Sequence, residues 1–484
     1  MGLRAAWLVA SLLAASACGK HHGEGGVDAG SAVDATPPDA CTTLACEQVD
    51  CGSKGLPDTT ISGTVFAPNG TLPLFGVNVY VPASDPGPLP AALSCDRCTD
   101  QVPGGALVLT TTDEAGHFSL PNVPIGTNVP VVIQVGKWRR QLVIPAAVAA
   151  CQDTAISAVD TTLPKNITDA SPLTAIDATG APKVDMPHIA ITTGNADALE
   201  CLIPKLGISP QEITNDTGPG HVHLYVNNGL GTGGGAKQFQ AGWPGGDGAA
   251  FGDAETMWSS LAALSAYDIV MFSCEGAQNP TTKTQAALEA VQQYADLGGR
   301  VFMTHWHNIW ISGEQNNPSH GIPTWETVAT WNFGAAQDLE TATSTVDTVH
   351  NPKGMSFATW LTNVGASTVP GQIPINEARY TCTADDPAEG TQFLFIDPTI
   401  PENANHTSVQ DLQFTTPVGA TADQACGKVV FSDMHVSSGS KSSNGQPYPG
   451  PGSGTGCAQT DLSPQEKALA FIFFDIASCV GQIQ

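Results

Sequence analysis

Basic side chains are scarce in this chain of 484 residues, where 18 Lys and Arg stand against 45 Asp and Glu, for a formal net charge of −27. Proteins bind phosphate backbones through Lys and Arg, so nucleic acid is not an expected partner. An anionic membrane surface would also repel the chain. Charged residues make up only 13%, whereas Gly and Pro number 51 and 36, which indicates many turns and loops rather than long solvated helices.

The apolar run at residues 5–17 is too short to span a bilayer, and it follows a positive Arg4 as the core of a signal peptide does. It ends in small residues directly before Cys18, a pattern that resembles a bacterial lipobox. Residues 1–18 are therefore expected to be a lipoprotein signal peptide, with an ordinary secretory signal as the alternative. A lipid on Cys18 would tether the protein to the outer membrane or cell surface. Residues 19–40 are rich in Gly, Ala, Asp and Pro and predict a disordered tether.

Thirteen cysteines fit an exported protein, because twelve remain after Cys18 and thiols pair in oxidising compartments. Up to six disulfides are expected. Residues 41–58 form a Cys-rich segment with three cysteines, which predicts an N-terminal knot that reaches Cys151. The Cys95-x-x-Cys98 spacing fits a loop staple better than a redox pair or half of a zinc site, because no second such pair follows.

Residues 59–152 predict an antiparallel β-sandwich, because short alternating segments are separated by turn signals such as Asn69-Gly70. The basic run 137–140 is expected to make an internal contact with the acidic C-terminal domain, with an anion-binding strip as the alternative. A set of strand and turn residues is distributed along the segment: Ser62-Gly63-Thr64-Val65, Pro73-Leu74-Phe75-Gly76-Val77-Asn78-Val79, Thr112-Asp113, Gly116, Phe118, Leu120-Pro121, Val123-Pro124 and Gly126. With these residues the segment resembles the carboxypeptidase regulatory-like family, a transthyretin-like sandwich that is usually an accessory module.

After a linker at 153–184, residues 185–484 alternate between apolar strands and amphipathic helices, which predicts an α/β domain with a mostly parallel sheet. Two helix signals are clear: Gly298-Gly299 closes a helix from 281, and Ser463 with Glu466 forms a capping box. The expected strands are 188–194, 266–276, 300–307 and 427–436, and the expected helices are 196–207, 281–299 and 463–477.

This order of strands and helices resembles the class I glutamine-amidotransferase-like fold, a flavodoxin-like sheet, in its trehalose-utilisation-like branch. Active amidotransferases carry a Cys at the sharp turn after the strand equivalent to 300–304. Here Thr304-His305-Trp306-His307 occupies that turn, so the resemblance implies a degenerate domain. The two-domain arrangement resembles bacterial surface lipoproteins without an assigned activity.

Ligands of open α/β sheets lie beyond the carboxyl ends of the strands, where this chain places reactive side chains. His305 and His307 after one strand, and Asp433 and His435 after another, are predicted to converge on one metal such as zinc. Glu275, His305 and His435 are the candidate catalytic residues, with Glu275 as a general base. The alternative is that these histidines are core residues that hydrogen-bond to backbone carbonyls or carboxylates and have no functional role.

Further candidate ligand-binding residues are Cys274, Trp306 and Trp310, although the even cysteine count favours a disulfide for Cys274. His221 and His223 form a second His-x-His pair in a Gly-rich stretch. The expected function is a non-catalytic binding or surface role toward a protein or glycan. The alternative is a metal- or His-dependent hydrolase acting on a sugar or amide.

Overall fold

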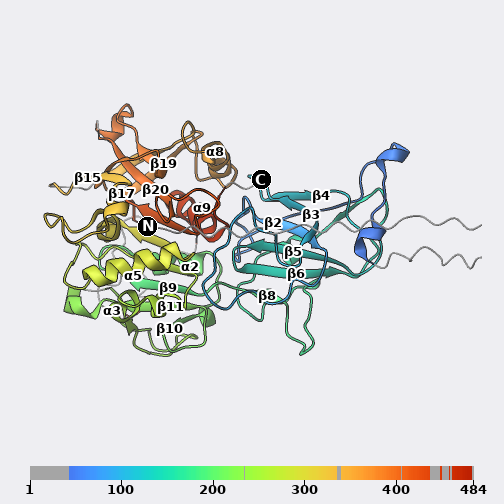
Figure 1. Ribbon diagram of the computed structural model, residues 1–484, viewed down its shortest axis with the longest axis horizontal. Coiled ribbons are helices and arrows are strands. Elements are labelled where there is room, and N and C mark those ends of the chain that lie inside the picture. Colours follow the sequence, from blue (N-terminus) through green and yellow to red (C-terminus); the bar gives the residue numbers. More distant parts are fainter. Residues whose placement is uncertain are drawn as a thin grey trace, which may run out of the picture. The chain divides into compact units, whose positions relative to one another are not determined.

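The N-terminal region, which we define as residues 43–186, is built on two sheets that share one apolar core. The computed structural model describes residues 43–233, 235–334, 339–404, 406–435, 447–449, 457 and 461–481 (Figure 1). Residues 43–484 form a single compact unit that is rich in sheet and has few helices. Cys18, the expected signal peptide, the tether and Cys41 lie outside the described residues.

One sheet has the strand order β4-β1-β7 and the other β3-β2-β5-β6-β8. All pairings in the larger of the two are antiparallel, while β1 and β7 run parallel. The strand bounds are β1 Thr60–Thr64, β2 Asn78–Pro82, β3 Ala106–Thr111, β4 His117–Leu120, β5 Val129–Val135, β6 Trp138–Ile144, β7 Asp153–Ala155 and β8 Val184–Asp185. The basic run 137–140 leads into β6, and the sequence predicts no strand there because two arginines interrupt the apolar alternation.

The C-terminal region, residues 187–484, contains one mixed sheet of eleven strands. Its parallel half has the order β10-β11-β9-β13-β14-β21, with β12 beside β11, and its antiparallel half continues as β20-β19-β16-β17. A two-stranded sheet pairs β15 with β18. The bounds are β9 Ile189–Thr193, β10 Ile213–Asn215, β11 Val222–Val226, β12 Gly252–Asp253, β13 Ile269–Phe272, β14 Arg300–Thr304, β15 Ala329–Trp331, β16 Leu339–Val346, β17 Gln372–Ala378, β18 Cys382–Asp385, β19 Gly390–Ile396, β20 Ser408–Thr416 and β21 Gly427–Ser432.

The prediction of a mostly parallel sheet therefore describes only one half of this sheet. The strands β19, β20 and β21 follow one another along the chain through connections without a crossover helix, and such connections join antiparallel strands. No strand is predicted between 329 and 416, because stretches such as 339–346 are rich in Thr and Ser and lack a continuous apolar face.

Helices cover both faces of the parallel half. Alternate strand residues, such as Met271 and Phe302, belong to the apolar cluster that contains α9, while their neighbours Phe272 and Met303 belong to the cluster that contains α5. The helix bounds are α1 Ala158–Thr161, α2 Leu202–Lys205, α3 Ala254–Trp258, α4 Leu261–Leu264, α5 Gln285–Asp296, α6 Ile309–Ser312, α7 Pro323–Glu326, α8 Gly354–Asn363 and α9 Pro464–Ala477. The 3-10 helices are η1 Leu44–Glu47, η2 Gly52–Lys54, η3 Leu199–Cys201, η4 Pro210–Glu212, η5 Asn228–Gly233, η6 His305–Asn308 and η7 Pro401–Asn403.

The strongest helix signals of the sequence are confirmed in α5 and α9. Thr284 caps α5 by accepting a hydrogen bond from the backbone of Ala287, and the Ser463–Glu466 capping box opens α9. The helix expected at 196–207 is only the short pair η3 and α2, because Pro204 lies within it and removes a backbone donor. In the part of the chain that the structure describes, no helix has both the length and the apolar character needed to cross a membrane.

Disulfides join distant segments of the chain. Cys51–Cys151 closes the N-terminal knot, which confirms that expectation, and Cys201–Cys457 lies within the C-terminal region. Cys95 pairs with Cys426 and Cys98 with Cys479, so the Cys-x-x-Cys segment is a structural staple, as favoured, and it connects the two regions. We call these two bonds the clasp.

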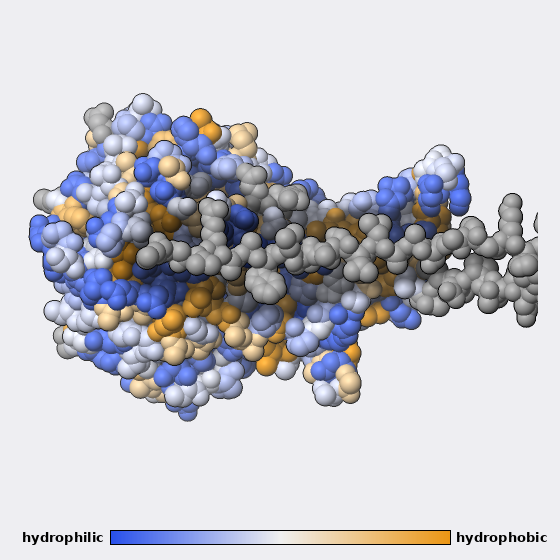
Figure 2. All heavy atoms as spheres, viewed as in Figure 1, coloured by the Kyte–Doolittle hydropathy of each residue, from blue (hydrophilic) through white to orange (hydrophobic). Residues whose placement is uncertain are grey.

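Apolar and ionic contacts reinforce the clasp. The ring of Trp138 packs against Phe473 and Phe474 of α9, at centroid distances of 5.7 and 5.5 Å. Lys137 forms an ion pair of 2.5 Å with Asp268, so the expected contact between the basic run and the acidic domain is confirmed for this residue. Figure 2 shows that apolar residues on the visible face lie in patches among hydrophilic ones.

Candidate functional site

The candidate site lies where three neighbouring parallel strands end. The strands β13, β14 and β21 are adjacent in the sheet, so their carboxyl ends meet at one edge. Cys274 follows β13, His305 follows β14 directly, and His435 follows β21. The sequence-based expectation that ligand-type side chains gather at these strand ends therefore rests on strands that are neighbours in the structure.

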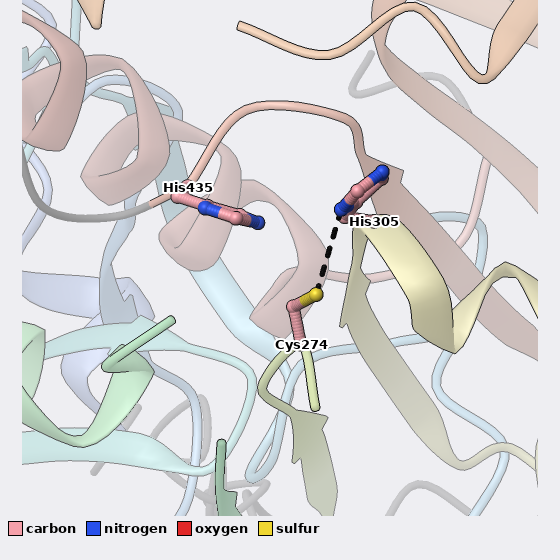
Figure 3. Close-up of side chains that lie close together, drawn as sticks. All are labelled: Cys274, His305 and His435. Carbon is pink, nitrogen blue, oxygen red and sulfur yellow. Dashed lines mark hydrogen bonds between the residues drawn. The ribbon is translucent and has the colours of Figure 1, made fainter. Parts of the chain in front are cut away.

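Cys274, His305 and His435 form a buried group that we call the thiol–imidazole cluster (Figure 3). One donor atom from each residue lies within 4.8 Å of the other two. The Cys274 Sγ is 3.5 Å from the His305 Nδ1, and the two imidazole centroids are 5.5 Å apart. The three side chains are 0%, 5% and 1% exposed, respectively, so the cluster is shielded from bulk water.

Cys274 is a free thiol, which corrects the expectation that it belongs to a disulfide. Its sulfur faces imidazole rings at the strand ends instead of another sulfur. The backbone of Cys274 donates to the Thr304 Oγ1 at 2.9 Å, and its Sγ accepts from the backbone N–H of Gly276 at 3.4 Å. These bonds fix the sulfur beside His305.

His435 is oriented by a carboxylate that the sequence did not single out. Its Nδ1 lies 3.1 Å from the Glu377 Oε2, which belongs to β17 at the far side of the antiparallel half. Burial alone would lower the pKa of His435, but hydrogen bonds with Cys274 and Glu377 and the charge of Asp197 raise it to about 10. Glu377 carries no local sequence signal, because it precedes His435 by 58 residues and only the folded antiparallel half brings the two side chains together.

Two residues of the site have left-handed backbone conformations that favour glycine. His305 has a φ of 37° at the turn from β14 into η6, and Glu377 has a φ of 53°. Such conformations in residues with a Cβ cost on the order of 1–3 kcal/mol, and they cluster where structure around a site holds them. Both therefore point to the same functional location as the buried cluster does.

His307 and Glu275 lie in a second buried group, together with Lys283, which we call the salt-bridged cluster. The Glu275 carboxylate is 2.6 Å from the Lys283 Nζ and 3.7 Å from the His307 Nε2. The Trp310 Nε1 donates to the His307 Nδ1 at 2.9 Å. Burial alone would raise the pKa of Glu275, but the Lys283 ammonium and His307 hold it well below its usual range.

The structure thus brings together two of the four predicted metal ligands, His305 and His435, and leaves His307 and Asp433 apart from them. Strand geometry would point residues i and i+2 the same way, but η6 begins at His305, so the alternation of β14 ends there. Asp433 instead accepts hydrogen bonds from Thr381 at 2.5 Å and from the backbone of Cys382 at 3.0 Å. Burial raises the pKa of Asp433 to about 6.

The candidate tryptophans also divide between the site and the core, and the second His-x-His pair lies outside the site. Trp306 is half-buried with its ring 5.0 Å from that of His305, whereas Trp310 is buried and packs on Phe272 at 5.1 Å. Trp306 therefore adjoins the thiol–imidazole cluster, and Trp310 belongs to the core. His221 pairs with Glu212 at 2.8 Å and His223 with the Tyr267 hydroxyl at 2.8 Å, so this pair does not converge on a ligand.

Comparisons with known proteins do not identify the chain. No family model and no curated protein matches it. A cytoplasmic protein of Salmonella typhimurium is similar in structure at 14% identity and a TM-score of 0.29, over 60% of this chain and 99% of that one. Two mutants of a type II cohesin–X-dockerin complex from Acetivibrio cellulolyticus are similar at 15% and 16% identity, each with a TM-score of 0.14. The first match covers 24% of this chain and 65% of the matched chain, and the second covers 33% and 78%. This chain therefore spans just under two thirds of the length of the first matched chain.

Proposed function

We propose that the protein is an exported, lipid-anchored protein of the cell envelope that carries a hydrolytic centre at the thiol–imidazole cluster. The leader with Cys18 supports export and anchoring. The four disulfides between described cysteines support an oxidising compartment. Replacement of Cys18 by Ala is expected to move the protein from the membrane fraction to the soluble fraction. Retention in the membrane fraction would argue against the lipid anchor.

We further propose that the two regions are a carboxypeptidase regulatory-like sandwich and an amidotransferase-like α/β domain with a flavodoxin-like parallel half. The motif residues between 62 and 126 support the first assignment. Helices on both faces of the parallel strands, and the left-handed His305 at the turn after β14, support the second. A crystal structure in which the sheet order differed from β9-β13-β14-β21 would contradict the second assignment.

The observation that carries the proposed activity is the convergence of a free thiol and two imidazoles at the carboxyl edge of the sheet. Imidazoles move protons in hydrolysis, and Glu377 orients His435 for that role. Trp306 beside His305 offers an aromatic surface to a sugar or amide substrate. The reaction class is the addition of water across a glycosidic or amide bond, with His435 as the acid–base group.

A panel of chromogenic glycosides, amides and esters tests this activity on the mature, disulfide-bonded protein. His435→Gln is expected to remove the turnover, because the variant cannot exchange the proton. His350→Gln is the matched control, because this histidine has a side chain that is 77% exposed and lies outside the site. Equal turnover in the wild type and His435→Gln would contradict the proposal.

A non-catalytic role, in which the C-terminal region binds a protein or glycan, is the second candidate. The burial of all three cluster residues favours it, because a substrate must reach atoms that are at most 5% exposed. Binding of a glycan without turnover of any substrate in the panel would favour this role over the hydrolytic one.

A further inference from the structure

We propose that Cys274, His305 and His435 hold a zinc-class divalent metal ion. This inference rests on the proposed function and changes one role within it: His435 binds the metal instead of exchanging the proton, and the metal would activate the water. The ligand set differs from the one that sequence periodicity suggests, since Cys274 replaces His307 and Asp433. The metal is therefore assigned to a site whose first ligand follows β13, the second β14 and the third β21.

The donor atoms select the class of metal. One thiolate sulfur and two imidazole nitrogens are borderline-soft ligands, which suit zinc and its neighbours in the transition series. Magnesium and calcium prefer oxygen ligands, and the three donors include none. A site with three protein ligands also leaves the fourth tetrahedral position for water, as catalytic zinc sites do.

The distances agree with one shared ion. Zinc bonds of about 2.3 Å to sulfur and about 2.0–2.1 Å to nitrogen place a sulfur and a nitrogen about 3.5 Å apart across a tetrahedral centre. The Cys274 Sγ and His305 Nδ1 are 3.5 Å apart. His435 is turned toward both (Figure 3), and the three donor atoms lie within 4.8 Å of one another, close enough for one ion to lie among them.

The surroundings supply the outer contacts that metal-bound histidines have. The Glu377 carboxylate bonds to the His435 Nδ1 and leaves the other ring nitrogen for the ion, as in carboxylate–histidine–zinc arrangements. Asp197 is fully buried near His435 and accepts a hydrogen bond from the Thr304 hydroxyl at 2.7 Å. Glu377 also forms an ion pair of 3.5 Å with Arg379, which holds its carboxylate beside His435.

The test measures zinc in the full mature protein and uses the second free thiol as an internal control. Wild-type protein is expected to bind about one zinc ion per chain. Zinc is also expected to slow the alkylation that Cys274 undergoes through transient opening of its buried site, as followed by mass spectrometry. Cys382 is also free and buried, but it lies beside Asp433 and outside the cluster, so zinc should not protect it. Cobalt(II) provides a readout that needs no variant, because a sulfur-to-cobalt charge-transfer band reports a Cys274 ligand.

Three variants sharpen the assignment. Cys274→Ser should lose the cobalt band and most of the bound zinc, whereas Cys382→Ser should keep both. Glu377→Gln should bind zinc roughly 10–100-fold more weakly, because it loses the charged orienting contact. Thermal unfolding of each variant without metal shows whether it has folded.

The outcomes separate this inference from the proposed function. Stoichiometric zinc without hydrolysis of any substrate would support the metal site and overturn the hydrolase. Hydrolysis that survives chelation but stops when Cys274 is alkylated would support the hydrolase and overturn the metal site. Absence of bound zinc, of a cobalt band and of protection in folded wild-type protein would also overturn the metal site.

Discussion

The thiol–imidazole and salt-bridged clusters are built from neighbouring positions of the same two strand ends, yet they differ in how their polar atoms are satisfied. Cys274 and His305 belong to the first cluster, and Glu275 and His307 to the second. In the second cluster, Glu275 is neutralised by Lys283 and also accepts hydrogen bonds from Asn227 and Asn279. In the first, one donor atom from each of the three residues lies within 4.8 Å of the other two.

This difference teaches that reactive residue types at a strand end do not make a site by themselves. A buried carboxylate with an ammonium at 2.6 Å and amide donors around it has little capacity left for chemistry. A thiol and two imidazoles whose donor atoms lie within 4.8 Å of one another are groups that can bind a ligand together. These contacts give Glu275 a role in the stability of the domain, whereas Cys274 belongs to the site of the proposed function.

The largest expected effect comes from the salt-bridged cluster. Lys283→Met leaves the Glu275 charge buried without its partner, which should lower the free energy of unfolding by about 3–5 kcal/mol. The double variant Lys283→Met with Glu275→Leu should recover most of that loss, because no charge then remains unpaired. Denaturant titration of the three proteins measures both effects, and a mild Lys283→Met variant would contradict a structural role.

Among the residues that the structure describes, Glu200 is a buried carboxylate without an ammonium partner at the distance of the Glu275–Lys283 pair, and it tests what that pairing contributes. Burial raises the pKa of Glu200 from 4.5 to about 8, so the folded state holds a proton that the unfolded state releases. This contribution to stability is complete below about pH 4.5 and is lost as the pH rises through about 8. Glu200→Gln should remove this loss and stabilise the protein at pH 7 by an amount on the order of 3 kcal/mol.

Thermal unfolding at pH 5 and pH 8 measures the effect of Glu200→Gln. The wild type should lose more stability than the variant between these two values, because only the wild type carries the titrating carboxyl. Parallel pH dependence of the two proteins would show that the carboxyl of Glu200 is not the group responsible.

A smaller effect separates the two tryptophans. Trp310→Phe removes the indole that donates to the buried His307, which should cost about 1–3 kcal/mol of stability. Trp306→Phe is the control, because Trp306 is half-buried beside His305 and outside the core. Equal losses in the two variants, measured by denaturant titration, would contradict the division between core and site.

The smallest expected effect is that of Cys274→Ser in protein stripped of metal. The hydroxyl replaces a thiol among polar neighbours, so stability should change by less than about 1 kcal/mol. If zinc binds, its addition should raise the melting temperature of the wild type and leave that of the variant unchanged. A large loss without metal would show that Cys274 serves mainly in packing.

The sequence predicted the strands that position the site, because β9, β13, β14 and β21 are continuous apolar runs bounded by polar turns. It also predicted His305 and His435 as site residues. It failed for His307 because the strand expected to reach residue 307 ends at Thr304. Glu377 could not be predicted from the sequence, since its contact with His435 joins residues 58 positions apart through the antiparallel half of the sheet.

The clasp has a consequence for how the protein tolerates proteolysis. Cys95 and Cys98 lie before the linker, and their partners Cys426 and Cys479 lie near the other end of the chain. A nick anywhere between residues 152 and 425 therefore produces two polypeptides that remain covalently joined until a reductant cleaves the bridges. After such a nick, the residues that build the site would stay attached to the N-terminal region.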